Sequence, residues 1–304
     1  NLTLTCSDVI PAPANIIITD NCDADLNVIF TEVSTKGTDP NAADFYTYII
    51  TRTWTANDAS GHVTPTITQV ITVQDLIAPS VVSNTVPVNI TINCPQTVPA
   101  PANVQFTDNC DQDLDVAYTQ VSTQTGDEND STFYNYTVTR TWKATDASGL
   151  SSPTITQVIT VQDITAPAVV ENTLPANLTL NCHDTIPNRA NVQFTETCDQ
   201  NFDITYNQVS TQGLIPNTPS YYNYTITRTW FAKDASNNTS PTYTQVITVH
   251  DVTAPVIVAN TLPSNVTLTC YDTIPNVTNV LFTDNCSTPS ITFNQTSTFV
   301  NNPT

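Results

Sequence analysis

The stretches YTVTRTW (residues 136–142) and ITQVITV (residues 155–161) decide the fold class. In both, apolar or aromatic side chains alternate with polar ones, which is the period of a β-strand with one buried face. The β-branched residues that dominate them fit a pleated sheet better than a helix. No segment of the sequence combines a helical apolar period with capping residues. The sequence therefore predicts an all-β protein.

The two stretches recur along the chain at a constant interval of 88 residues. Because the chain has 304 residues, it holds about 3.5 copies, and we expect it to be a slice of a longer array. We place the copies at residues 1–75 (truncated on the N-terminal side), 76–163, 164–251 and 252–304 (truncated on the C-terminal side). The columns that follow this interval include Cys6, Cys94, Cys182 and Cys270; Cys22, Cys110, Cys198 and Cys286; Arg52, Arg140 and Arg228; and Trp54, Trp142 and Trp230.

Seven short strands are predicted in each full copy. In the second copy they lie near residues 80–85, 89–93, 103–107, 114–123, 133–138, 139–145 and 155–162, with the sixth continuing the fifth. This number of strands fits an immunoglobulin-like sandwich of two sheets. A hairpin turn with positive φ is expected where Gly61, Gly149 and Asn237 recur. The prediction is tandem immunoglobulin-like β-sandwiches joined end to end as a rod or filament, with short Asp-x-x-Ala-Pro linkers that limit bending.

Composition and charge exclude several classes of function. With 7 Lys and Arg residues and a net charge of −20, the chain lacks the basic face that nucleic acids require. The 5 glycines form no phosphate-binding loop, and no long apolar run predicts a membrane insertion in this segment. Asn1 opens directly in a strand pattern, so no signal peptide is predicted. The three histidines fall in different columns and no nucleophile elbow occurs, so we predict that the protein is not an enzyme.

The eight cysteines form one pair in each copy, 16 residues apart. Pairing within each copy closes four equal loops, whereas other pairings have to cross between copies. Disulfides imply an oxidising compartment outside the cytoplasm. The alternative is that the cysteines bind zinc, but no recurring histidine supplies the remaining ligands. The predicted disulfides are Cys6–Cys22, Cys94–Cys110, Cys182–Cys198 and Cys270–Cys286.

Recurring acidic residues near the junctions between copies have two interpretations, of which the first is a calcium site. Hard oxygen ligands in such clusters suit Ca²⁺. The alternative is that these residues form Asx turns and keep the array soluble. Copy four weakens the metal interpretation, because Asp284 is followed by Ser287 and Pro289. The candidate ligands are Asp20, Asp23, Asp25, Asp75, Asp108, Asp111, Asp113, Asp163, Asp199 and Asp251.

Two further columns have a structural and a functional interpretation. Arg52 and its equivalents are expected to pair internally with a carboxylate rather than to bind a ligand. The aromatic column that contains Tyr46, Tyr134 and Tyr222 is expected to fill the core, and the alternative is a stacking platform for sugars. Solvent exposure of these three rings distinguishes the two interpretations.

Several motifs resemble one family. The run at Asp108 (DNCD), the strand at Thr139 (TRTW), the turn at Thr145 (TDASG) and the segment at Val158 (VITVQDITAP) are similar to the HYR-like repeats of giant Bacteroidetes surface proteins, the SprB-type mobile adhesins. The resemblance covers essentially the whole chain. It implies an immunoglobulin-like fold, type IX secretion, and an extracellular filament attached to the outer membrane at the cell surface. Ser148 stands where the family often has cysteine, so a second disulfide of relatives is not expected.

The resemblance also implies O-glycosylation signals and a role. The candidate sites are Ser131, Thr185 and Thr273. The implied function is a structural stalk of a large secreted adhesin that serves surface adhesion or gliding motility. The alternatives are an array of carbohydrate-binding sandwich modules and accessory repeats of a secreted multidomain hydrolase. Expected partners are neighbouring repeats of the same chain, and beyond them surface glycans or outer-membrane motility and secretion machinery.

Overall fold

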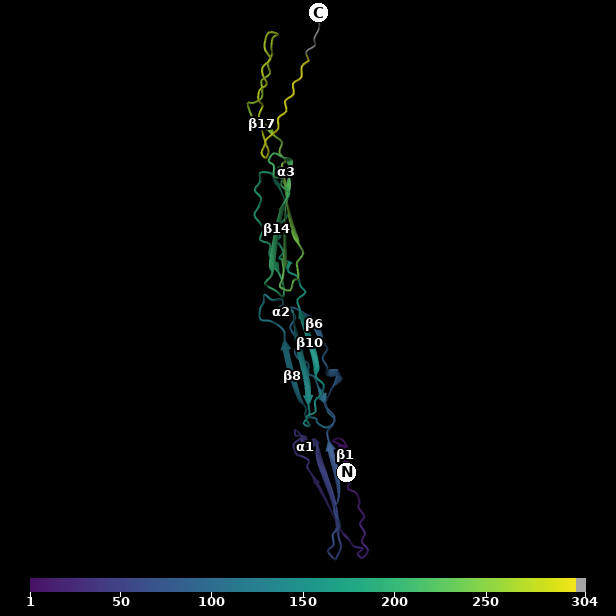
Figure 1. The fold of residues 1–304 in the computed structure, drawn as a ribbon. Coiled ribbons are helices and arrows are strands. Elements are labelled where there is room, and N and C mark those ends of the chain that lie inside the picture. Colours follow the sequence, from purple (N-terminus) through teal and green to yellow (C-terminus); the bar gives the residue numbers. More distant parts are fainter. Residues whose placement is uncertain (299–304) are drawn as a thin grey trace. The chain divides into compact units, whose positions relative to one another are not determined.

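The computed structural model describes residues 1–298 of the chain. The chain divides into two compact units, one formed by Asn1–Asp163 and the other beginning at Ile164. Each unit is described by itself below (Figure 1). We use the word module for one copy of the repeat, complete or truncated.

The first module of unit 1 is built on a four-stranded sheet. Its strands are β1 (Leu2–Thr5), β2 (Asn27–Ser34), β3 (Tyr48–Asn57) and β4 (Ile67–Gln74), in the order β1-β4-β3-β2. β1 runs parallel to β4, and the other pairs are antiparallel. The C-terminal ends of β1 and β4, the first and last strands of the module, therefore lie at the same end of the sheet.

The second module of unit 1 repeats this arrangement. Strands β6 (Ile90–Asn93), β8 (Asp115–Ser122), β9 (Tyr136–Thr145) and β10 (Ile155–Gln162) follow the order β6-β10-β9-β8, again with one parallel pair. A two-stranded sheet of β5 (Ser80–Val81) and β7 (Phe106–Thr107) completes the module. Figure 1 shows β6, β10 and β8 running alongside one another.

Unit 2 contains the third copy of the same fold. Its main sheet is β12 (Leu178–Asn181), β16 (Tyr243–His250), β15 (Tyr224–Lys233) and β14 (Asp203–Ser210), in that order. Two small sheets pair β11 (Ala168–Val169) with β13 (Phe194–Thr195) and β17 (Val256–Ile257) with β18 (Phe282–Thr283). The all-β prediction is confirmed, and three sandwich-like modules follow one another in tandem along the chain.

Helical turns occupy parts of two predicted strands, those at residues 80–85 and 133–138. A single turn of helix precedes one inner strand of each main sheet. These turns are α1 (Ala43–Tyr46) before β3, α2 (Ser131–Tyr134) before β9 and α3 (Pro219–Tyr222) before β15. A 3₁₀ turn, η1, spans Ser83–Thr85. The fifth strand predicted at residues 133–138 is therefore wrong in its first half. In α2 the side chain of Asp130 accepts a hydrogen bond from the backbone of Thr132, which satisfies one of the open N–H groups of the turn.

The core of the third module has two parts. In unit 2, Trp230 packs with Val192, Phe194 and Ala232 toward one end of the sheet. Ile226, Ile247 and Val249 form a second cluster, against which Leu180 and Cys182 pack. The turn column is confirmed, because Gly61, Gly149 and Asn237 all have positive φ, at 88°, 85° and 72°.

The buried arginines hold the module together, but mostly not through ion pairs. Arg52 Nε lies 2.7 Å from the carboxylate of Glu32, as predicted. In the second module Arg140 instead donates to the amide oxygen of Gln120 at 2.8 Å and to the carbonyl of Pro99 at 2.6 Å. The prediction of a carboxylate partner is therefore wrong there, because glutamine occupies the position of Glu32. Arg140 therefore connects strand β9 to the segment around Pro99, which crosses the module between β6 and β7.

Candidate metal centre at the module junction

The cysteines join consecutive modules, so the predicted pairing is wrong. Cys6 is bonded to Cys110 in unit 1, and Cys182 is bonded to Cys286 in unit 2, each pair 104 residues apart in sequence. These bonds exclude all four predicted disulfides, Cys6–Cys22, Cys94–Cys110, Cys182–Cys198 and Cys270–Cys286, because each of those pairs contains a cysteine that is bonded elsewhere.

The path of the chain explains why the two cysteines of one module do not meet. The backbone N–H of Cys94 bonds to the carbonyl of Gln162, the last residue of β10. The loop of Cys110 instead lies at the other end of the sheet, where Asp111 accepts a hydrogen bond from Ala147 in the turn before β10. The 8 residues of β10 separate these ends by roughly 27 Å, far beyond the 7 Å that a disulfide tolerates.

We call these two ends of a module the trailing end, which carries its first cysteine, and the leading end, which carries its second. The bond from Cys6 to Cys110 thus connects the trailing end of one module to the leading end of the next. A cross-link that closes a loop of about 100 residues stabilises by about 4.7 kcal/mol in the chain-entropy account. The disulfide is therefore a strong constraint on the junction between modules.

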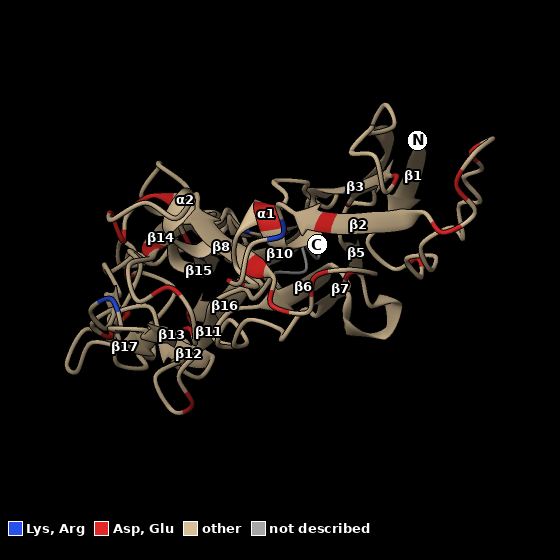
Figure 2. Cartoon of the chain, turned by 90° about the horizontal axis from the view of Figure 1, so that it is seen from below, with Lys and Arg blue, Asp and Glu red and all other residues tan. Residues whose placement is uncertain are grey.

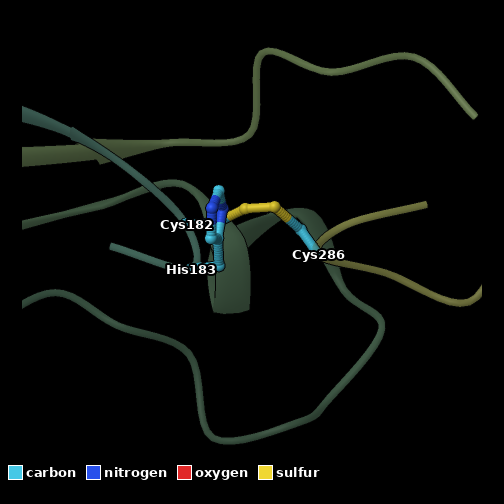
Figure 3. Close-up of side chains that lie close together, drawn as sticks. All are labelled: Cys182, His183 and Cys286. Atoms are coloured by element: carbon cyan, nitrogen blue, oxygen red, sulfur yellow. A yellow bond between two sulfur atoms is a disulfide. The ribbon is translucent and has the colours of Figure 1, made fainter. Parts of the chain in front are cut away.

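His183 lies beside the corresponding disulfide of unit 2. Figure 3 shows its ring next to the bonded sulfurs of Cys182 and Cys286. One ligand atom of each of the three residues lies within 4.8 Å of the others. Because both sulfurs are in a disulfide, they offer no thiolate to a metal. His183 instead contacts Asn285 across the junction, with Nδ1 and Nδ2 3.2 Å apart.

An acidic loop accompanies each second cysteine. The Oδ1 atom of Asp108 accepts hydrogen bonds from the backbone N–H groups of Cys110 (2.8 Å) and Asp111 (3.1 Å). Asp20, Glu196 and Asp284 make the same two contacts in their loops. The Asx turns considered as the alternative to a metal site are therefore present. They account for only one oxygen of each carboxylate.

Three buried carboxylate oxygens at the junction of the first and second modules lack a hydrogen-bond partner among the described residues. Asp75, Asp108 and Asp146 are 5%, 8% and 6% exposed. Each has an Oδ2 atom without a hydrogen-bond partner among the described residues. Burying unpaired carboxylates costs several kcal/mol per ion. The few Lys and Arg residues visible in Figure 2 stand against many Asp and Glu, so no described cation compensates the three.

The pKa values of two of these groups reflect their crowding. Burial raises the pKa of Asp75, and the neighbouring charges of Asp108 and Asp146 raise it further. The pKa of Asp146 is raised by burial and by the charges of Asp108 and Asp111. Buried, mutually repelling carboxylates with open oxygens are the donor set that Ca²⁺ prefers. The chemistry of these residues suits a calcium ion, but among the described residues the ligand atoms that lie within 4.8 Å of Asp75 as a group of three belong to Cys6 and Cys110, not to Asp108 and Asp146.

The junction of unit 2 brings together the same kinds of residue. One carboxylate oxygen of Asp251, one of Asp284 and Sγ of Cys286 lie within 4.8 Å of one another. Asp284 Oδ2 is buried and has no hydrogen-bond partner among the described residues. Asp251 follows the last strand of the third module, as Asp75 follows the last strand of the first. Copy four thus contributes Asp284 to an acidic pair with Asp251 of copy three, although Ser287 stands in its loop.

The structure separates the predicted ligands into groups. Asp75 and Asp108 converge at one junction, and Asp251 lies at another. Asp111 and Asp199 are buried, but both of their oxygens accept backbone hydrogen bonds. Asp163 is buried as well. Asp20, Asp23, Asp25 and Asp113 retain solvent exposure, and the first three take part in turn hydrogen bonds.

Sequence reasoning left out two members of the clusters. Asp146 lies in the turn that contains Gly149 and was not among the candidate ligands, but its second oxygen is buried and has no hydrogen-bond partner among the described residues. Asp284 was discounted because of the residues that follow it. A signal for Asp146 was available, since the turn aspartate recurs with the same period as the other acidic columns.

Two rings of the aromatic column are buried at the trailing ends rather than displayed. Tyr46 is 9% exposed and Tyr134 is 7% exposed, whereas Tyr222 is half-buried. The hydroxyl of Tyr46 donates to Asp111 of the next module at 3.3 Å. Burial, followed by the charge of Asp111, raises the pKa of Tyr46. Tyr46 thus fills the junction inside unit 1, and the burial of both rings disfavours a sugar platform.

The candidate glycosylation sites lie near the surface. Thr185 and Thr273 are exposed, and Ser131 is partly exposed at the start of α2. The described residues include no helix that is long and apolar enough to cross a membrane.

Comparison with known proteins gives distant structural similarities. No protein-family model and no curated protein sequence matches the chain. Drosophila N-cadherin EC1-3 is 12% identical, with a TM-score of 0.28 and coverage of 83% of this chain and 97% of that chain. Mouse clustered PcdhgC3 EC1-3 is 15% identical, with a TM-score of 0.28 over 67% and 77% of the two chains. Zebrafish RET cadherin-like domains 1 to 4 are 8% identical, with a TM-score of 0.20 over 74% and 66%.

The raised pKa values predict an unusual pH dependence in the presence of a chelator. The unfolded carboxyl titrates near 3.8, and the folded pKa of Asp75 and Asp146 lies higher, so these groups penalise the native state at pH 7. The variant Asp75→Asn/Asp146→Asn should melt above the wild type at pH 7 in EDTA. Its advantage should shrink as the pH falls toward 4, as measured by calorimetry.

Asp130 provides the control with the opposite sign. Hydrogen bonds from Thr132 lower its pKa, so Asp130→Asn should melt below the wild type at pH 7, and this difference should also shrink toward acid. A double variant that is less stable than the wild type at pH 7 in EDTA contradicts the account of the cluster.

Proposed function

We propose that this chain is a structural segment of a secreted adhesin, in which tandem modules act as a covalently clipped and calcium-stiffened stalk. The observation that carries the proposal is that both the disulfide and the acidic cluster lie at junctions between modules. Disulfides of this kind persist outside the cytoplasm, which supports an extracellular location. The role of the modules is mechanical, and no reaction is assigned to them.

The finer features of the proposal come from the sequence resemblance. It supports a cell-surface filament used in adhesion or gliding, exported by type IX secretion in a Bacteroidetes organism. The partners that the modules themselves supply are their neighbours in the same chain. Surface glycans and the outer-membrane motility or secretion machinery are the further partners we propose for such a filament.

Calcium would act at the junction by replacing repulsion with attraction. Asp75 and Asp108 come from two modules that the disulfide Cys6–Cys110 already holds together. A cation shared by carboxylates of both modules would oppose bending about the linker between them. The residues that would hold the ion are Asp75, Asp108 and Asp146 in unit 1, and Asp251 with Asp284 in unit 2.

Calcium binding is tested on the full chain by titration calorimetry. The variant Asp75→Asn/Asp251→Asn removes one carboxylate from each of the two proposed sites and should bind two fewer Ca²⁺ ions per chain. It should also lose the rise in melting temperature that Ca²⁺ causes in the wild type. At a Ca²⁺ concentration of 100 times the dissociation constant, one site adds about 2.7 kcal/mol to the free energy of unfolding. The matched control is Asp25→Asn/Asp113→Asn, which changes exposed aspartates and should behave as the wild type. Equal calcium binding by all three proteins contradicts the calcium proposal.

The mechanical role is tested by pulling single chains from both ends. Each disulfide clips 104 residues, which should add roughly 340 to 370 Å of extension when it is reduced. The variant Cys6→Ser/Cys182→Ser should show this extra extension without reductant. A gain of only about 60 Å per bond, which is the length of a 17-residue loop within one module, contradicts a clip between modules.

A further inference from the structure

The last strand of each main sheet is an open edge. Among the described residues, β2, β8 and β14 pair on one side only, with β3, β9 and β15. All eight residues of β2 and of β8 are exposed, and so are seven of the eight in β14. An edge strand of this length presents a row of backbone N–H and C=O groups that a further strand can bind.

One hydrogen bond beyond the end of β8 shows which of its backbone groups are open. The N–H of Thr123 bonds to the carbonyl of Thr137 at 3.0 Å. Bonded and non-bonded residues alternate along an antiparallel pair, so every second residue counted back from Thr123 directs its backbone groups toward β9. The residues between them direct theirs toward the open edge. These are Val116, Tyr118, Gln120 and Ser122.

The same pattern recurs in the other two modules. Thr35 bonds to the carbonyl of Ile49 and Thr211 to that of Thr225, both at 2.9 Å. The open positions of β2 and β14 are therefore the equivalents of those in β8. They are Val28, Phe30, Glu32 and Ser34 in β2, and Ile204, Tyr206, Gln208 and Ser210 in β14.

These edges lack the features with which proteins usually prevent edge pairing. The sequences NVIFTEVS, DVAYTQVS and DITYNQVS contain no proline, lysine or glycine, and their pairing with the inner strand runs without a bulge. Large apolar side chains are displayed instead. Val33, Val121 and Val209 are 65%, 64% and 57% exposed. The edges are therefore suited to bind another strand.

The charge of the chain favours a second copy as that partner only at these edges. With a net charge of −20, two copies repel each other over most of their surface. β8 and β14 each carry one charged residue, Asp115 and Asp203, at the first position. Glu32 in β2 is 2.7 Å from Arg52, which compensates it. A second copy also offers the same row of donors and acceptors, and an antiparallel strand of this kind is its own complement.

We propose that two copies of this chain bind side by side through these edges, with β8 of one copy antiparallel to β8 of the other. The equivalent contact is available to β2 and to β14. Such a contact is isologous, because both copies use the same surface. It continues the four-stranded sheet of one copy into that of the other, and it would join two stalks laterally.

One register engages every open backbone group of β8. It places Thr119 opposite Thr119 of the second copy. Val116 then pairs with Ser122 of the second copy, and Tyr118 pairs with Gln120 of the second copy. Each of these pairs and their symmetry mates exchange two hydrogen bonds, about eight in all.

This register sets no two like charges opposite each other. Asp115 lies opposite Thr123 of the second copy. In the equivalent pairing of β2, Glu32 lies opposite Phe30 of the second copy. The contact uses neither the disulfides nor the carboxylates at the module junctions, so it can fail or succeed independently of the proposed function.

Cross-linking of full-length Thr119→Cys tests the register. The two copies of position 119 form a non-hydrogen-bonded pair with Cα atoms about 4.5 Å apart, a separation that a disulfide accepts. Oxidation by glutathione disulfide in EDTA should link the peptide that contains position 119 to the same peptide of the second copy. Because Cys22 and Cys270 are exposed native thiols, the readout is this linked peptide, identified by mass spectrometry, rather than a dimer band.

The matched control is Ala117→Cys, which changes an exposed residue of the same strand. In the proposed register Ala117 lies opposite Val121 of the second copy. The two introduced thiols are then four residues apart along the strand, roughly 13 Å, which a disulfide does not span. No self-linked peptide is expected. Equal linkage at positions 117 and 119 indicates chance collision and overturns the proposal.

The variant Val28→Pro/Val116→Pro/Ile204→Pro tests the backbone pairing itself. It removes one outward N–H group from each edge, a position where an edge strand tolerates proline. The control Val28→Ala/Val116→Ala/Ile204→Ala retains these N–H groups. In sedimentation equilibrium in EDTA, the wild type and the alanine variant should form dimers, and added salt should increase the dimer fraction because it screens the repulsion. The proline variant should stay monomeric, with a native circular dichroism spectrum.

Two sedimentation results contradict the proposal. A wild type that stays monomeric at every salt concentration shows that the edges do not bind a second copy. A folded proline variant that dimerises as strongly as the alanine variant shows that the backbone edge is not the contact. Should the proline variant fail to fold, the comparison of positions 117 and 119 still decides the question.

Discussion

The disulfide between consecutive modules is the constraint on which the rest of the structure depends. Cys6 stands at the trailing end of one module and Cys110 at the leading end of the next, so the bond fixes which ends meet. It brings the residue after the last strand, Asp75, beside the acidic loop of the following module, because Asp75 and both sulfurs lie within 4.8 Å of one another. The acidic cluster is thus a consequence of the same connection.

The junction carries opposing forces. The disulfide and the buried ring of Tyr46 hold the two modules in contact, whereas the carboxylates of Asp75, Asp108 and Asp146 repel one another. In our proposal a calcium ion would remove this conflict, since it would supply the positive charge that the described residues lack there. In the same proposal the stiffness of the stalk increases with the calcium concentration, while the disulfide keeps consecutive modules joined whether or not calcium is bound.

Much of the module could be predicted from sequence, and the junction could not. Alternation along YTVTRTW identified the buried strands, and the recurrence of Gly149 identified the hairpin turn, because both signals are local. Cysteine pairing is not local. The spacing of 16 residues suggested a closed loop, but the intervening segment crosses the whole module, a path that depends on the parallel pairing of β6 with β10. The candidate ligands Asp146 and Asp284 were missed for the same reason, since convergence across a junction has no sequence period of its own.

Mapping the disulfides of the native chain tests the central claim most directly. Proteolysis without reductant, followed by mass spectrometry, should recover the peptide of Cys6 linked to that of Cys110 and the peptide of Cys182 linked to that of Cys286. Recovery of Cys6 linked to Cys22 would contradict the account, because the modules would then be stapled internally and nothing covalent would join their ends.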